Sequence, residues 1–350
     1  MSSSDLLEGL PTAAPAQAKA PLRFIDVAVT ATANEFAGIY RNKQYHEPDF
    51  DAVLDRAAQA GVDKVMLTGM SLGDVEVHRK LAAARPQQCS YTIGVHPYHA
   101  AEPAEDPGYL ERLGDAVAAA LLKEERTPCP VAAFGELGLD YDRLDRCPGD
   151  VQIQTFRAQL DLYLARGFTA LPLFLHCRGA AFDDFVAIMR EYIPRISAAA
   201  AATAATATTD RTTTARRHGL VHSFVGTSSQ MQLLTTELGL DVSVNGFSFR
   251  DRPSIEMVRD VPLEHLHIET DAPWGLIPAT ADVARRYLVN APPLPASKKR
   301  DKFDQAAMVK ERNESCCIDR VAYIVAGIKG LAVEEVCDRA RENSAAMFGL

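Results

Sequence analysis

The sequence has little that would suit a secreted or membrane-bound protein. Its seven cysteines are an odd number, are scattered, and include no CxxC pair, which indicates reduced thiols in an intracellular compartment. No apolar run approaches the roughly 18 residues needed to span a bilayer, so we expect no membrane partner. Residues 1–20 are rich in Ser, Ala and Pro and contain no arginine, which is untypical of a signal peptide or a mitochondrial presequence. We expect a flexible tail there.

Positive charge is also scarce. The chain has 37 Lys and Arg against 46 Asp and Glu, a net charge of −9, which argues against a general nucleic-acid coat protein with a basic face. An enzyme with a local basic groove is not excluded by this balance. With 350 residues and 47% hydrophobic content, the chain has enough apolar side chains for one large core. We therefore expect residues 21–350 to form a single domain.

Eight short β-rich runs alternate with helical patterns along the chain. Such alternation predicts a parallel sheet, and eight units close as a (β/α)8 TIM barrel of the α/β class. The alternative, an open doubly wound sheet, would place its ligand at one switch point between two strands. The polar residues described below follow the fourth, fifth, sixth and eighth runs, and only a closed barrel brings those strand ends to one centre. The pattern favours the barrel.

Residues 197–217 are a low-complexity Ala/Thr tract with little apolar bulk. We predict a disordered loop there, because Thr-rich stretches are mediocre helix formers. The tract connects the helix after the fifth strand to the sixth strand, on the face of a barrel opposite the active site, where a long insert is tolerated. A partner-binding element is the functional alternative.

Four polar residues end apolar runs in the same format: Glu136, His176, His222 and Asp271. A carboxylate in an apolar setting must be compensated, and one Glu, two His and one Asp at four strand ends predict a metal site. Taken singly, Glu136 would be a solvated loop residue and His222 a core histidine. Glu269 lies two residues before Asp271, on the same strand face. We expect it to contact residues that bind the metal rather than the metal itself.

This mixture of oxygen and nitrogen donors suits Mg²⁺, Mn²⁺ or Zn²⁺, and composition does not choose among them. Such a site supports hydrolysis, because the metal lowers the pKa of a bound water while a carboxylate takes its proton. We expect Asp271 and Glu136 to be the catalytic carboxylates, with Asp271 taking the proton. Two ions about 3.5–4 Å apart would favour phosphodiester cleavage.

These residues resemble a known family. The chain is similar to the TatD-related metal-dependent deoxyribonucleases, within the amidohydrolase-like barrels, and looks nearest to their eukaryotic branch. The resemblance runs over about residues 24–350, apart from the Ala/Thr tract. The motifs that carry it are Gly94–Pro97, Gly135–Asp140, Phe174–Arg178, His222–Thr227, Glu269–Pro273 and Arg312–Glu314.

The resemblance implies that Glu136, His176, His222 and Asp271 hold one or two divalent ions, with Mg²⁺ first and Mn²⁺ or Zn²⁺ as alternatives. It also implies 3′-to-5′ exonuclease action on DNA, with single-stranded or frayed ends as the expected substrate and roles in DNA repair and apoptotic DNA degradation. We expect a monomer or weak oligomer. The cytosol is the default compartment, with the nucleus or mitochondrion open because DNA is there.

The sequence departs from the family where many members carry His-x-His after the first strand, since residues 27–30 here read Val-Ala-Val-Thr. We expect the loss of these two nitrogen ligands to weaken one of the two metal positions, with Asp26 supporting the other through water. His96 and Arg178 are expected to contact substrate phosphate, with a Pro-fixed turn as the alternative for His96. Arg312 is either structural support or a phosphate contact. The basic run at residues 298–302 is either solvated or meets the DNA backbone.

Two other functions remain open at this point. One is hydrolysis of an ester or amide on the same metal site, for example deacylation of D-aminoacyl-tRNA, which is also associated with this family. The other is a barrel without catalytic activity that serves as a binding module. The presence of Glu136, His176, His222 and Asp271 argues against the second alternative.

Overall fold

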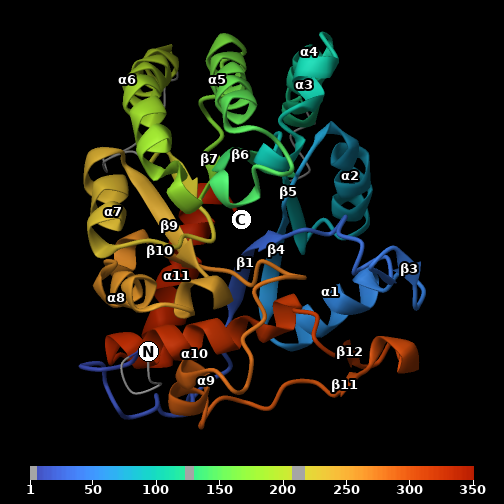
Figure 1. Ribbon diagram of the computed structural model, residues 1–350, viewed down its shortest axis with the longest axis vertical. Coiled ribbons are helices and arrows are strands. Elements are labelled where there is room, and N and C mark those ends of the chain that lie inside the picture. The colour runs from blue at the N-terminus through green and yellow to red at the C-terminus, as the bar shows by residue number, and fades with distance from the viewer. Residues whose placement is uncertain (1–5, 123–129, 207–216) are drawn as a thin grey trace. The chain divides into compact units, whose positions relative to one another are not determined.

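The computed structural model describes residues 6–122, 130–206 and 217–350. Within these residues eight parallel strands form one sheet in sequence order, β1-β4-β5-β6-β7-β8-β9-β10, with helices between them. This order contains no switch point, so the doubly wound alternative is wrong and the predicted (β/α)8 barrel class is confirmed (Figure 1). In the described part of the chain no helix is long and apolar enough to cross a membrane.

The backbone groups into two compact units. The first contains residues 1–67, 225–231 and 243–346, and the second contains residues 68–224, 232–242 and 347–350. The prediction of a single domain over residues 21–350 therefore stays a prediction.

The first unit contains both ends of the strand sequence. Its strands are β1 Phe24–Val29, β2 Ile39–Tyr40, β3 Lys43–Gln44, β4 Val62–Leu67, β10 Leu266–Ile268, β11 Ser297–Lys298 and β12 Met308–Val309. Its helices are α1 Phe50–Gln59, α8 Arg252–Asp260, α9 Asp282–Tyr287, α10 Ile318–Lys329 and α11 Val333–Phe348, whose last two residues belong to the second unit. β1 pairs in parallel with β4, and a bridge joins Val29 to Ala272 just after β10.

The second unit contains the middle strands β5 Cys89–Ile93, β6 Val131–Asp140, β7 Leu173–Arg178 and β8 Gly219–Val221, with the first residues of β9 Leu240–Val244. Its helices are α2 Val75–Ala84, α3 Glu102–Glu105, α4 Tyr109–Leu121, α5 Gly149–Ala165 and α6 Phe182–Thr206; α7 Ser228–Gln232 and a π-helical turn, Leu233–Glu237, precede β9. All ten residues of β6 are buried, as expected for a central strand of a parallel sheet.

The helices follow their sequence signals. α1 buries Phe50, Val53, Leu54 and Ala57, which recur at helical spacing on one face. Asp251 caps the start of α8, because its side chain accepts a hydrogen bond from the Ser254 N–H at 2.9 Å.

Two predictions of disorder need correction. Residues 197–206 of the Ala/Thr tract continue α6, because alanine is the strongest helix former and outweighs the threonines there; residues 207–216 lie outside the described part. The supposed tail is packed over residues 6–20. Leu7 and Leu10 are buried, and the Pro11 carbonyl accepts a hydrogen bond from Tyr287.

The six cysteines of the described residues are buried and form no disulfide, as the reduced-thiol prediction requires. Cys129 lies outside those residues.

Candidate metal centre

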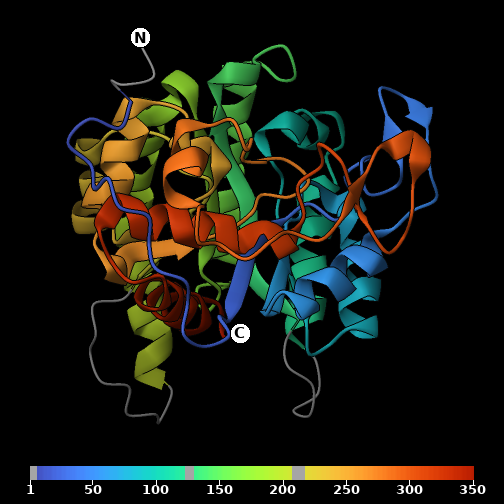
Figure 2. The ribbon, with the colours of Figure 1, turned by 90° about the horizontal axis from the view of Figure 1, so that it is seen from below.

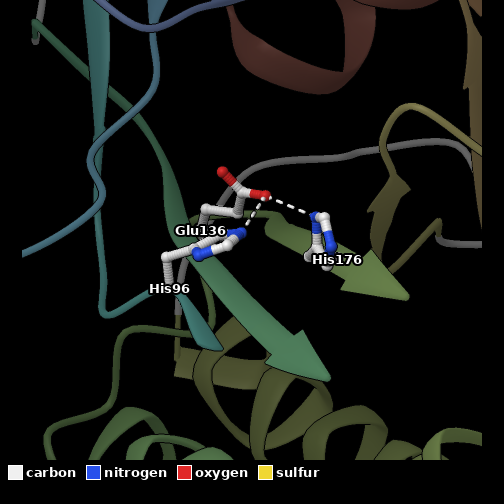
Figure 3. Close-up of side chains that lie close together, drawn as sticks. All are labelled: His96, Glu136 and His176. Atoms are coloured by element: carbon white, nitrogen blue, oxygen red, sulfur yellow. Dashed lines mark ion pairs between the residues drawn. The ribbon is translucent and has the colours of Figure 1, made fainter. Parts of the chain in front are cut away.

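The centre of the second unit is a glutamate ringed by imidazoles. Glu136 lies in the middle of β6, His96 follows β5 and His176 lies within β7 (Figure 3). His222 follows β8. One carboxylate oxygen, Oε1 of Glu136, is 2.6 Å from His222 Nε2, 2.8 Å from His176 Nδ1 and 3.3 Å from His96 Nε2. We call these four residues the Glu136 cluster.

The backbone of neighbouring strands sets these positions. The N–H of His222 donates to the Leu175 carbonyl at 2.9 Å, and the N–H of Glu136 donates to the Gly69 carbonyl at 3.1 Å. Gly138, at φ +148°, lies so close to β7 that a Cβ there would overlap the His176 carbonyl. Glu136 was predicted to end its strand, but β6 continues four residues further beside β7.

The Glu136 cluster is buried. The exposed fraction of its side chains is between 3% and 7%, so little water screens the charge of the carboxylate. Burial alone would raise the pKa of Glu136, but the adjacent His222, His96 and His176 hold that pKa well below its usual value. The carboxylate is therefore ionised at neutral pH.

The histidines differ from one another. Burial lowers the pKa of His96, which the nearby Glu136 only partly offsets. Burial also opposes charge on His176, yet hydrogen bonds with Asp140 and Glu136 raise its pKa above the ordinary value. His176 thus lies between two carboxylates, with Nδ1 toward Glu136 and Nε2 toward Asp140 at 3.0 Å.

Asp140 is a site residue that we did not predict. It ends β6 and lies four residues after Glu136, on the same face of the strand. Its Oδ2 contacts His176 and accepts a hydrogen bond from the Tyr98 hydroxyl at 3.1 Å. If residues 137–140 had been predicted as strand, the alternation of side chains would have placed Asp140 on the same face as Glu136.

The donor set of the Glu136 cluster fits a divalent ion. One ligand atom each from His96, Glu136 and His176 lies within 4.8 Å of the others, and all three residues are buried. Imidazole nitrogens with a carboxylate oxygen suit Zn²⁺ and Mn²⁺ at least as well as Mg²⁺. His222 contacts the same carboxylate oxygen and completes a three-histidine, one-carboxylate set.

The expected residues of the first unit have different surroundings. Asp26 is buried on β1 and accepts hydrogen bonds from the Thr270 N–H at 2.9 Å and hydroxyl at 2.6 Å. Burial raises its pKa to about 6, although Thr270 acts in the other direction. Glu269 accepts from the Ser243 hydroxyl at 2.6 Å and the Asn245 amide at 2.9 Å. Asp271, beyond the end of β10, belongs to this unit as well, so its role at the Glu136 cluster stays a prediction.

The two arginines expected near substrate are both engaged with protein. Arg178 Nη2 donates to the Ser223 carbonyl at 3.0 Å and hydroxyl at 2.8 Å, which holds the residue next to His222. Arg312 is only 2% exposed and forms a bidentate pair with Asp49 at 2.7 and 2.6 Å. This geometry favours structural support over a phosphate contact for Arg312.

A buried carboxylate with three imidazoles, placed by successive strands of a parallel α/β barrel, defines a metallohydrolase type of site. Comparison with known proteins makes this specific. The family model described as TatD related DNase matches residues 26–349, and the chain belongs to that family.

Individual relatives agree with this assignment. The chain is 37% identical over 330 residues to Deoxyribonuclease Tat-D of Schizosaccharomyces pombe, covering 92% of this chain and 95% of the relative. It is 29% identical over 329 residues to the 3'-5' ssDNA/RNA exonuclease TatD of Erwinia billingiae, covering 93% and 98% of the two chains. The crystal structure of an uncharacterized amidohydrolase from Saccharomyces cerevisiae superposes with a TM-score of 0.80 at 29% identity, covering 94% of this chain and 100% of that one.

Proposed function

We propose that this chain is a divalent-metal-dependent deoxyribonuclease that removes nucleotides from the 3′ end of DNA. The observation that carries the proposal is the contact of three buried imidazoles with one oxygen of Glu136. The names of its relatives support the substrate, since they are a deoxyribonuclease and a 3'-5' ssDNA/RNA exonuclease.

His96, Glu136, His176 and His222 are the residues that would hold the ion in the second unit. A bound divalent ion supplies Lewis acidity toward a phosphate and lowers the pKa of water. Asp140 orients His176 through Nε2, and Tyr98 holds Asp140 in turn. Burial of these side chains keeps competing water away from the charges. The proton acceptor remains the predicted Asp271.

The test is digestion of single-stranded DNA labelled at either end, with Mg²⁺, Mn²⁺ or Zn²⁺ supplied in turn. Wild type should shorten the strand from its 3′ end, and EDTA should stop it. Glu136→Gln keeps the side-chain shape and removes the charge, and should lower kcat/KM by about 10⁴-fold, because metal-supplied charge stabilisation is worth several kcal/mol. Glu76→Gln, a change of the same kind on the surface of α2, should cut like wild type.

Cleavage that survives Glu136→Gln would place the active site elsewhere. If wild type cuts no DNA with any of the three ions, the nuclease proposal fails. Release of amino acid from D-aminoacyl-tRNA would then favour the ester-hydrolase alternative, and silence in both assays would favour a binding module. Roles in DNA repair and apoptotic degradation follow from the resemblance and need a cellular test.

A further inference from the structure

A second feature belongs to the first unit and includes part of the basic run at residues 298–302. A pocket of about 320 Å³ is lined by Tyr45, Lys299, Arg300, Asp301, Lys310 and Glu311. It brings the β2–β3 hairpin together with the segment around β11 and β12, more than 250 residues later in the chain. Figures 1 and 2 show these two segments side by side. We call it the Arg300 pocket.

Arg300 is held by aromatic rings. Its guanidinium carbon lies 5.1 Å from the centre of the Tyr40 ring and 4.8 Å from that of Tyr45. Lys43 also lies 5.2 Å from the Tyr45 ring centre. Stacking of this kind uses the face of a guanidinium and leaves its N–H edge to donate, which is the edge that binds phosphate.

The cations of the pocket have no carboxylate partner in the part of the chain that the structure describes. Among the described residues, Lys299, Arg300 and Lys310 form no ion pair, although Asp301 and Glu311 line the same pocket. Lys298 differs, since it pairs with Asp304 at 2.6 Å. Charges held near one another without compensation attract an external anion.

The surrounding charge is unlike that of the chain as a whole. Residues 41–47 and 298–311 carry seven lysines and arginines against four carboxylates, in a protein whose net charge is −9. The excess therefore reflects a local concentration of positive charge. A merely solvated basic run would need neither a pocket nor a pair of half-buried tyrosines to hold one of its arginines.

We propose that the Arg300 pocket binds the phosphate backbone of a nucleic-acid strand, with Arg300, Lys299 and Lys310 pairing with successive phosphates. This inference rests on the proposed nuclease function, because the strand held there is the substrate. The volume of about 320 Å³ lies near the lower limit of ligand pockets, which suits a strand backbone better than a folded partner. The pocket would add affinity for long substrates without entering the chemistry.

The test measures binding without cleavage. Fluorescence anisotropy of a labelled single strand of about 16 nucleotides, in EDTA, is compared for wild type, Lys299→Gln/Arg300→Gln/Lys310→Gln, and a control with the same loss of charge. The control is Lys80→Gln/Arg146→Gln/Arg339→Gln, at three exposed positions outside the pocket. Circular dichroism checks that each variant is folded.

The pocket variant should bind at least about 10-fold more weakly than wild type at low salt. Its slope of log K against log salt should fall by about 2, because each phosphate that no longer pairs with a cation removes roughly 0.7 from the slope. The control should change affinity less than about 3-fold. Arg300→Lys keeps the charge but removes the planar fork, and should give an intermediate affinity. Equal weakening in the pocket variant and the control would overturn the proposal, since net charge alone would explain it.

Other sources of phosphate are separated by competition. Unlabelled single strand should displace the labelled strand. Displacement by inorganic phosphate at equal phosphate concentration, or equally tight binding to phosphatidylserine vesicles through the same three residues, would overturn the assignment to nucleic acid.

The two proposals fail in different ways. If strand binding depends on the Arg300 pocket but the protein cuts no DNA, the binding proposal stands and the nuclease proposal fails. If wild type cuts DNA and the pocket variant binds the strand as tightly as wild type, the nuclease proposal stands and the binding proposal fails. Glu136→Gln should bind the strand as wild type does and fail to cut it.

Discussion

Two of the buried groups of ionisable side chains in the described residues differ in the balance of their charges. In the first unit, Arg56 and Arg312 pair with Asp49 and Glu314, so two cations meet two anions, and we call this the Arg312 network. In the second unit, the Glu136 cluster surrounds one carboxylate oxygen with three imidazoles, none of which carries a fixed charge. The difference separates structural support from a ligand-binding site.

Balance explains what each group does. Guanidinium groups stay charged and bind carboxylates with two parallel hydrogen bonds, so the charges of the Arg312 network are paired within it, although among the described residues Nε of Arg312 has no hydrogen-bond partner. Imidazoles are metal ligands when neutral, and their nitrogens converge on the same oxygen in the Glu136 cluster. A cation from solution would complete that cluster, whereas it would disturb the Arg312 network.

The largest expected effect comes from breaking the balanced group. Arg312→Met should lower the free energy of unfolding by about 3–5 kcal/mol, because Asp49 and Glu314 remain buried with too little positive charge. Urea denaturation measures the change. Arg339→Met, at an exposed pair with Glu342, should change stability by less than about 1 kcal/mol.

If Arg312→Met were as stable as the control but bound DNA more weakly, the phosphate-contact alternative for Arg312 would be right after all. The Arg312 network would then be a ligand-binding site as well, and not structural support alone.

How far the sequence predicts these groups depends on the element that carries each residue. His176 and His222 come from short apolar runs whose ends are plain in the sequence, and the structure brings both to Glu136. Asp140 was missed because the strand was predicted to end at Glu136, and glycines such as Gly135 and Gly138 are uncommon inside strands. Their backbone, at φ +151° and +148°, lies within a ten-residue strand instead. The pairing of Asp49 with Arg312 joins residues 263 positions apart, and no local pattern predicts such a pairing.

Asp319 belongs to neither group, and its carboxylate, which is only 14% exposed, extends the comparison to pH. Asp319 lies in the first turn of α10; its Oδ1 has no hydrogen-bond partner among the described residues and lies 3.7 Å from Arg320 Nε. Burial raises its pKa to about 6, partly offset by Arg320. The folded protein therefore holds a proton that the unfolded chain releases near pH 4.

This pKa shift sets the direction in which stability changes with pH. The stabilisation from neutral Asp319 is complete below pH 3.8, the ordinary pKa, and is lost as pH rises through about 6. Asp319→Asn lacks this dependence. Relative to wild type, the variant should gain up to about 3 kcal/mol of unfolding free energy between pH 4 and pH 7.5. Urea denaturation of both proteins across that range measures the gain, and two parallel stability curves would show that Asp319 is not buried as a charge.

The smallest effect concerns the orientation of a ligand in the Glu136 cluster. Asp140→Asn removes the charge that faces His176 Nε2 and leaves the side-chain shape. We expect metal affinity to fall by about 10- to 100-fold, because partners of metal-binding histidines set the ring orientation and its basicity. Competition with a coloured chelator measures the affinity independently of nuclease activity.

Two controls separate orientation from folding. Tyr98→Phe removes only the hydrogen bond to Asp140 and should weaken metal binding less than Asp140→Asn does. Glu102→Gln removes the charge of a carboxylate that is bound to His99 and lies at 40% exposure, and it should leave metal affinity unchanged. Unchanged metal affinity in Asp140→Asn would mean that Glu136 alone orients His176. Asp140 would then have no part in metal binding by the Glu136 cluster.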